Sequence, residues 1–337
     1  MKIGFSRKPI GKGGAITWIK TFSDFCVSKG HKVYFSYKDN IDVFCSVANY
    51  SKPEELKYLK DHNIKILQRL GAIFLDYNYD DQRIIKDGNE HLKQLIKYAD
   101  CIVYQSNFSK KELFGSLYNG KEPDGHIIYN STNTTSFNPQ VPLKSSKNKK
   151  IILSTAYWGA SNTAFKSVNL LIEVAKLLKN NKDIEFWLLG LAPKEVHDFA
   201  VNAKLPNITK INLLKPIDYS SMPNYLQDSD LILHLKAHEG CSNMVIETMH
   251  TGTPLVGLNS GSLPELLGDA ALLADCSSDI HTFPNVNIED LKKKILLTLE
   301  QQDVYRNKMI SRSNLYSEKT QYTKYLSLLH DLYKNHQ

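Results

Sequence analysis

The chain has 337 residues and a formal net charge of +7, with 42% hydrophobic and 23% charged residues and a mean hydropathy of -0.34. This composition is close to that of average folded domains, so it excludes a disordered chain, a collagen-like repeat and a membrane bundle, and the length favours two domains. No apolar run is long enough for a transmembrane helix, the first residues turn polar too early for a secretory signal, and the five cysteines form no C-x-x-C pair. We therefore expect a cytoplasmic protein with reduced thiols.

Basic residues are concentrated in the first part of the chain. Residues 1–140 carry 20 lysines and arginines against 15 acidic residues, and residues 141–150 add four lysines and no acid. This surface leaves open a peripheral contact with the anionic cytoplasmic face of a membrane, although a solvated lysine-rich surface is the simpler explanation. No zinc-knuckle spacing or aromatic RNA-binding pattern is present, so we expect no nucleic-acid partner.

The first half alternates short β-branched or apolar runs with amphipathic segments. The predicted strands cover residues 2–6, 32–37, 42–47, 65–70, 101–106 and 126–130, and helical patterns cover 15–30 and 89–100. Residues 138–150 then contain two prolines and a lysine/serine run without hydrophobic periodicity, which is typical of a linker. We predict a first domain over 1–140 and a linker over 141–150.

The second half repeats the alternation and predicts a second domain over 151–315. Its predicted strands cover residues 151–156, 184–190, 208–214, 230–237, 254–259 and 270–275, with helical patterns over 167–180 and 288–302. Such alternation predicts an α/β fold with two Rossmann-like, doubly wound parallel sheets. The last segment has apolar residues at helical spacing, so one of its faces must be buried.

The first candidate site is the glycine-rich segment GKGGAITWIK, residues 11–20, which follows the first strand and opens a helix. Gly13 and Gly14 would let backbone amides approach an anion. The segment is neither a Walker A loop nor G-x-G-x-x-G, because Ile16 occupies the last glycine position. The glycines could equally serve the turn alone.

The second candidate is the segment 234–256, where a predicted strand ends near Ala237 and a loop follows. Ser242 is a good N-cap, so a helix should start near Asn243. The N–H groups at that start would face the ligand position at the carboxyl end of the sheet and could hold a phosphate or diphosphate.

Two acidic residues in this segment could bind the ribose and other hydroxyl groups of a nucleotide ligand. Glu247 lies about one turn into the predicted helix, at a distance that suits a ribose diol, and Glu239 on the loop could reach hydroxyls beyond the phosphate. The alternative for Glu247 is a first-turn acid that complements the helix dipole.

Lys166 is the third candidate, predicted in a strand-to-helix loop, where it could neutralise a diphosphate or be a plain surface lysine. Asp228 and Asp230 have the spacing of a divalent metal site, but a helix-end role for these acids is favoured. His234 and His238 would not share a helical face, so they are not predicted as ligands.

A family resemblance joins these segments. The run EGCSNMVIETMHTGTPLV, residues 239–256, resembles the nucleotide-sugar signature of retaining glycosyltransferases of family 4, which have the GT-B fold of two Rossmann-like domains facing a central cleft. Further segments match the family in order: GGAITWIKTFSDFCVSKGHKV at 13–33, CIVYQSNFSKKEL at 101–113, IIYNSTNTTSF at 127–137 and NSGSLPELLGDAALL at 259–273. The similarity covers nearly the whole chain.

The resemblance implies roles for individual residues. Glu247 would hold the ribose of a nucleoside diphosphate sugar, Glu239 the hydroxyls of the donor sugar, and Lys166 the diphosphate, with Lys166 and Glu239 as the catalytic residues. Gly13 and Gly14 would approach the donor phosphate from the first domain when the cleft closes. The distal phosphate would lie against the backbone amides of Gly240, Cys241, Ser242, Asn243, Met244 and Val245. The helix at 316–337 would pack back on the first domain.

Two features depart from the family pattern. An arginine usually precedes the lysine, but Tyr157 and Trp158 stand in that region here. The catalytic residue of the first domain also has no clear match, and Arg69, Asp76 and Ser106 are strand-end candidates.

The resulting expectation is a retaining, metal-independent glycosyltransferase without a cofactor. It would transfer sugar from a nucleoside diphosphate sugar, UDP- or GDP-linked first, to a hydroxyl of a glycan, lipid-linked or other acceptor. The first domain would bind the acceptor and the second the donor. The alternatives are a GT-B sugar-nucleotide epimerase or hydrolase, and a non-catalytic sugar-nucleotide-binding subunit, which the absent arginine favours.

Overall fold

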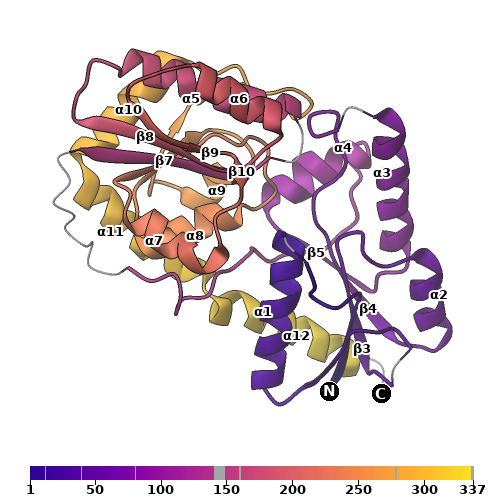
Figure 1. The fold of residues 1–337 in the computed structure, drawn as a ribbon. Coiled ribbons are helices and arrows are strands. Elements are labelled where there is room, and N and C mark those ends of the chain that lie inside the picture. Colours follow the sequence, from indigo (N-terminus) through magenta and orange to yellow (C-terminus); the bar gives the residue numbers. More distant parts are fainter. Residues whose placement is uncertain are drawn as a thin grey trace. The chain divides into compact units, whose positions relative to one another are not determined.

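The computed structural model describes residues 1–11, 13–38, 40–79, 81–139, 149–158, 161–277 and 279–334. The chain divides into two compact units, each with its own sheet and helices (Figure 1). Unit 1 comprises Met1–Leu75, Asp81–Ser131 and Tyr316–Gln337, and unit 2 comprises Asp76–Asp80 and Thr132–Leu315. Most of the predicted linker, residues 141–148, lies outside the described residues. No helix over the described ranges is both long enough and apolar enough to cross a bilayer.

Unit 1 is built on a parallel sheet with the strand order β2-β1-β3-β4-β5-β6. Its strands are β1 (Lys2–Phe5), β2 (Lys32–Tyr34), β3 (Val43–Val47), β4 (Lys65–Arg69), β5 (Cys101–Tyr104) and β6 (His126–Ile127). Its helices are α1 (Gly14–Ser28), α2 (Pro53–Asp61), α3 (Gln82–Lys97), the π-helix η1 (Ser109–Phe114), α4 (Gly115–Leu117) and α12 (Glu318–Lys334).

Helices α1 and α12 share an aromatic core with the sheet of unit 1. Trp18 and Phe22 of α1 lie against Tyr325 and Tyr322 of α12, with ring centroids 4.9 Å and 5.2 Å apart. All four side chains are buried. Large rings bury much apolar area, so this cluster fixes the C-terminal helix in unit 1.

Unit 2 contains the parallel strand order β9-β8-β7-β11-β12-β13, with β10 antiparallel to β8. Its strands are β7 (Lys150–Tyr157), β8 (Ile184–Leu191), β9 (Ile208–Asn212), β10 (Leu214–Lys215), β11 (Leu231–His234), β12 (Leu255–Leu258) and β13 (Leu272–Ala274). Its helices are α5 (Ser161–Leu177), α6 (Lys194–Asn202), the 3-10 turn η2 (Tyr219–Ser221), α7 (Met222–Gln227), α8 (Asn243–Thr251), α9 (Leu263–Leu267), α10 (Ile288–Glu300) and α11 (Gln302–Ser313), and the turn η3 (Asn314–Tyr316) leads to α12.

Each sheet has one point at which the strand order reverses. In unit 1 it lies between β1 and β3, and in unit 2 between β7 and β11. The loops that leave the carboxyl ends of such neighbouring strands diverge and form the usual ligand position of open α/β sheets. The prediction of two Rossmann-like, doubly wound sheets is confirmed.

The boundary between the units lies earlier than the predicted residue 140. Phe137 packs on Tyr219 with ring centroids 5.4 Å apart, and Gln227 Nε2 donates to the carbonyl of Asn138 at 2.8 Å. These contacts attach the segment after Ser131 to unit 2, although its composition is that of a linker.

Candidate functional site

The loop after β11 leads directly into α8 at the reversal point of unit 2. Ser242 stands at the N-cap position with extended backbone and Asn243 is the first helical residue, as predicted. The Ser242 side chain makes no capping hydrogen bond. The backbone amides of Gly240 to Val245 thus surround a helix start that its own N-cap side chain does not occupy.

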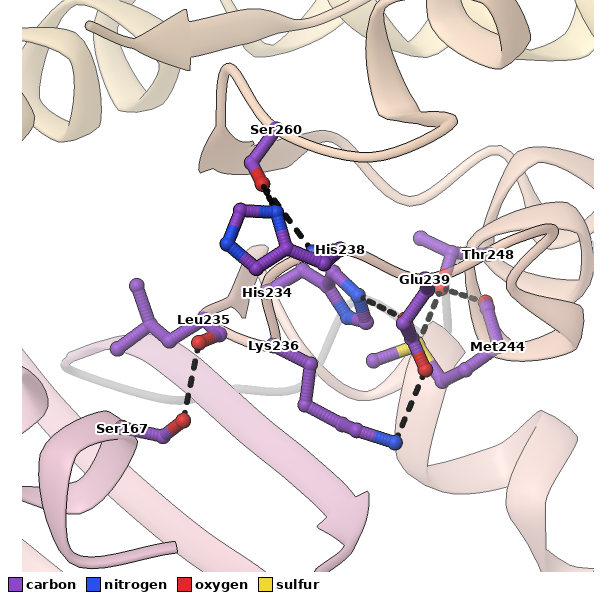
Figure 2. A network of polar contacts seen from close by, with 9 residues as sticks. All are labelled: Ser167, His234, Leu235, Lys236, His238, Glu239, Met244, Thr248 and Ser260. Carbon is purple, nitrogen blue, oxygen red and sulfur yellow. Dashed lines mark hydrogen bonds and ion pairs between the residues drawn. The ribbon is translucent and has the colours of Figure 1, made fainter. Parts of the chain in front are cut away.

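Glu239 is held at both carboxylate oxygens. His234 Nε2 lies 2.7 Å from Oε2, and Lys236 Nζ lies 3.0 Å from Oε1 (Figure 2). His234 is buried at the end of β11, and its Nε2 must carry the proton in order to donate to a carboxylate. Burial acts to raise the pKa of Glu239, but Lys236 and His234 outweigh it and hold the pKa well below its usual range. Glu239 is therefore an ionised, oriented carboxylate.

A second turn fixes the backbone that carries Glu239. The His238 N–H donates to Ser260 Oγ at 3.1 Å, and the Ser260 hydroxyl lies 2.9 Å from His238 Nδ1. His238 Nε2 donates to the carbonyl of Thr282 at 2.9 Å, which makes the Nε2–H tautomer the one that satisfies both contacts. Burial lowers the pKa of His238, so the neutral ring is favoured.

The close approach of the turn at Ser260 to the backbone of Glu239 requires glycine at position 261. Gly261 has a φ of 65°, and a Cβ there would lie 2.7 Å from the Glu239 nitrogen. His238 itself adopts a left-handed φ of 55°, which is uncommon for a residue with a side chain. The Ser262 N–H closes the contact by donating to the Glu239 carbonyl at 2.9 Å.

Glu247 occupies the fifth position of α8 and is 6% exposed. The helix has no acid in its first turn, so the first-turn dipole alternative does not describe this residue. Burial raises the pKa of Glu247 to about 7, against a lowering hydrogen bond from the Tyr219 side chain. A buried carboxyl next to a helix start is suited to accept hydrogen bonds from a diol when it ionises.

The raised pKa of Glu247 makes folding stability depend on pH. Because the folded protein holds a proton that the unfolded chain releases above about pH 4.5, this contribution is complete below that pH. It is lost as the pH rises through about 7. The site thus contains one carboxyl that is fully ionised, Glu239, and one that titrates near neutrality.

Lys166 is an exposed residue in the second turn of α5, not in a loop as the sequence analysis predicted, because the helix already begins at Ser161. Its neighbour Ser167 is buried and donates from Oγ to the Leu235 carbonyl at 3.1 Å (Figure 2). This bond ties α5, one residue after Lys166, to the loop that leads to Glu239.

The two glycines of the first candidate lie in unit 1. Gly13 is the N-cap of α1 with φ 116° and ψ 155°, a region that essentially only glycine adopts, and Gly14 is the first helical residue. A Cβ at Gly13 would meet nothing within 4 Å, so the requirement for glycine comes from the backbone alone.

The candidates for a catalytic residue in the first domain have structural partners instead. Arg69 is buried, donates to Asn130 Oδ1 at 2.7 Å and lies 4.5 Å from the Trp18 ring centroid. Ser106 Oγ accepts the Ser109 N–H at 2.8 Å. Asp76 lies in unit 2 and pairs with His281 at 2.7 Å, so it is not a strand-end residue of the first domain.

Asp230 serves the sheet rather than a helix end, because its carboxylate contacts strand β7. Its Oδ2 accepts the Ile151 N–H at 2.8 Å, and its Oδ1 lies 3.2 Å from Lys150 Nζ.

The sequence analysis missed the two partners of Glu239, which are His234 and Lys236. The three-residue spacing of Lys236 and Glu239 is the signal that the sequence offers for this ion pair.

The comparisons with known proteins agree with this fold. The family model "Glycosyl transferases group 1" matches residues 141–315, and the chain belongs to this family. No curated protein matches the chain.

Several solved structures share the fold at low identity. Sucrose-phosphate synthase from Thermosynechococcus elongatus has a TM-score of 0.77 and 13% identity, covering 99% of both chains. Anabaena Alr3699/HepE in complex with UDP-glucose has a TM-score of 0.70 and 15% identity, covering 98% of this chain and 100% of that one. The UDP-forming α,α-trehalose-phosphate synthase from Burkholderia xenovorans has a TM-score of 0.63 and 11% identity, covering 96% of this chain and 80% of that one. The predicted GT-B architecture is confirmed.

Proposed function

We propose that the chain is a retaining glycosyltransferase of family 4, which transfers a sugar from a nucleoside diphosphate sugar to a hydroxyl acceptor. The observation that carries the proposal is the arrangement of Glu239 and Glu247 around the start of α8. One carboxyl is ionised and held by two partners, and the other is buried with a pKa raised to about 7. Both lie beside backbone amides at the reversal point of a nucleotide-binding type of sheet.

The donor is proposed to lie across these groups in order. Glu247 accepts hydrogen bonds from the ribose diol, the amides at the start of α8 hold the distal phosphate, and Glu239 contacts the sugar hydroxyls. UDP is the first base to test, because HepE was solved with UDP-glucose and the trehalose-phosphate synthase is named as UDP-forming. GDP is the second.

Catalysis is proposed to rest on stabilising the charge of the leaving diphosphate. Lys166 and the positive end of the α8 dipole supply the positive charge that offsets it, so no metal and no cofactor is invoked. Glu239 has both oxygens bound and Glu247 is assigned to ribose, so neither is offered as a covalent nucleophile. Attack on the same face as the leaving group, assisted by its phosphate, gives retention.

The acceptor is proposed to be a hydroxyl of a glycan or a lipid-linked sugar, bound by the first domain. A cytoplasmic location with peripheral contact at the membrane face would suit a lipid-linked acceptor, and the positive charge of residues 1–140 would favour it. Co-sedimentation with anionic vesicles, compared with neutral vesicles, tests this part separately.

A thermal-shift panel with UDP, GDP, ADP and dTDP sugars tests the proposed donor class. A ligand that binds only the folded protein stabilises it by about 2.7 kcal/mol at a hundredfold excess over Kd. We expect one base to raise the melting temperature clearly above the others. No shift with any of the four would contradict the proposal.

Turnover with and without acceptor separates the remaining alternatives. A transferase consumes donor efficiently only with acceptor, an epimerase or hydrolase consumes it alone, and a binding subunit does neither. The absence of the usual arginine before Lys166 is the observation that keeps the binding subunit as a second candidate.

A further inference from the structure

The segment that leaves the carboxyl end of β7 is poor in cations. The sequence between Lys150 and Lys166 contains no lysine or arginine. Tyr157, 66% exposed, and Trp158, buried, occupy the end of the strand instead. No lysine or arginine of the segment between β7 and Lys166 would therefore reach a diphosphate at the carboxyl end of this sheet.

A second ammonium group stands on the neighbouring loop. Lys236 lies two residues after β11, is 32% exposed, and points its Nζ at Glu239 Oε1 (Figure 2). Ser167 and Leu235 are joined by a 3.1 Å hydrogen bond, and Lys166 and Lys236 are their direct neighbours in sequence. The backbones that carry the two lysines are thus fixed to each other at the reversal point of the sheet.

We propose that Lys236 is the second cation of the donor diphosphate site and replaces the arginine that this chain lacks. The inference rests on the proposed function. In the donor-free protein Lys236 is held by Glu239, and a bound diphosphate takes it over. A lysine ammonium is a compact charge on a flexible four-carbon stem and is a common phosphate ligand.

The geometry of Glu239 allows this exchange without leaving a bare buried charge. His234 holds Oε2 at 2.7 Å from a buried position on the strand, so that contact persists when Lys236 leaves. Oε1 then becomes available to accept a hydroxyl of the donor sugar. Binding of the diphosphate and exposure of the sugar-binding oxygen are therefore one coupled step.

The alternative is that Lys236 only neutralises Glu239. The two accounts differ in which ligand is affected by removing the ammonium group. If Lys236 contacts the diphosphate, removing its ammonium group weakens binding of a nucleoside diphosphate more than binding of the matching monophosphate. If Lys236 only neutralises Glu239, its removal affects binding of the sugar donor and of neither free nucleotide.

The test measures Kd by calorimetry for UDP, GDP, ADP and dTDP, each paired with its monophosphate, on the wild type and three variants. Lys236→Gln removes the charge and Lys236→Arg retains it. Lys176→Gln is the matched control, because Lys176 makes a similar three-residue ion pair with Glu173 at 2.7 Å elsewhere on α5. Melting curves establish that each variant is folded.

For the diphosphate that the wild type binds best, we expect Lys236→Gln to weaken binding about 10-fold to 100-fold, the effect of losing a charge-assisted contact. The monophosphate should change less than about threefold, Lys236→Arg should recover most of the affinity, and Lys176→Gln should match the wild type. Unchanged diphosphate binding in Lys236→Gln, or equal losses for both nucleotides, would overturn the assignment. Failure of the wild type to bind any of the four diphosphates would instead overturn the proposed function and the assignment with it.

Discussion

Unit 1 and unit 2 each have one reversal of strand order, and the loops at the two reversals are built differently. After β1, unit 1 presents exposed Arg7 and Lys8 and a glycine backbone: Gly11 and Gly13 both have a φ of 116°, and a Cβ at either would meet nothing within 4 Å. After β11, unit 2 presents ionisable side chains fixed by named partners, with Glu239 between His234 and Lys236.

The difference indicates which part of a reaction each loop can support. The glycine backbone of unit 1 can approach an anion closely, but residues 6–13 contain no carboxylate. Under the proposed function, Glu239 would contact the sugar, Lys166 and Lys236 the diphosphate, and Glu247 the ribose. Donor recognition and charge stabilisation are therefore proposed to lie in unit 2.

The largest expected effect is on turnover. Lys166→Gln should lower kcat by about 10²-fold to 10³-fold, because a fixed positive charge aimed at a developing anion is worth that much in other active sites. Steady-state kinetics with donor and acceptor measure it, and Lys176→Gln serves as the control on the same helix. A Lys166→Gln variant with near wild-type kcat would remove Lys166 from the chemistry.

Glu239→Gln sharpens the division within unit 2. This variant should keep or raise the affinity for free diphosphate, since Lys236 is released from its ion pair, while kcat/KM for the full sugar donor falls about 10-fold to 100-fold. Calorimetry and kinetics on the same preparation measure both. Equal losses for free nucleotide and sugar donor would show that Glu239 does not distinguish them.

Gly13→Ala tests the backbone role given to unit 1. An alanine side chain is strained at φ 116°, so we expect a loss of about 1–3 kcal/mol in folding stability or local rearrangement at the start of α1. Gly115→Ala is the control, because Gly115 is helical and its Cβ would lie 3.7 Å from Glu122 Oε2, an ordinary contact. Urea unfolding of both variants measures the difference, and equal stabilities would remove the special role of Gly13.

Chelation should have the smallest effect. The positive charges assigned to the diphosphate belong to Lys166, Lys236 and the start of α8, so turnover should be unchanged in EDTA. Loss of activity that magnesium or manganese restores would contradict this and return Asp228 and Asp230 to consideration.

The sequence predicted features that depend on local patterns. Strand and helix alternation gave the two sheets, and Ser242 followed by Asn243 gave the start of α8, because N-cap preference acts over a few residues. It missed features set by distant segments. The orientation of Glu239 depends on the turn at Gly261, twenty-two residues later, and on His234 from the strand before it.

Local sequence patterns also misplaced the domain boundary and the start of α5. The segment after Ser131 has the residues of a linker, yet Phe137 and Asn138 attach it to unit 2. Lys166 was expected in a loop, but α5 begins five residues earlier. In both places contacts across the fold outweigh local preference, which no pattern of neighbouring residues records.

Nucleoside diphosphate affinity as a function of pH, in the wild type and in Glu247→Gln, addresses the role of unit 2 most directly. The pKa of Glu247 is raised to about 7 by burial, and ribose hydroxyls donate to the ionised form, so binding should expel the proton. The wild type should bind more tightly as the pH rises from about 5.5 to about 8.5, with the change centred near 7. The ligand's own phosphate titrates equally with both proteins, so the difference between the wild type and Glu247→Gln reports the Glu247 carboxyl alone. We predict that this variant binds about 10-fold to 100-fold more weakly at high pH and lacks the carboxyl-dependent rise. Equal affinities and equal pH profiles in the two proteins would contradict a ribose contact at Glu247 and, with it, the donor site in unit 2.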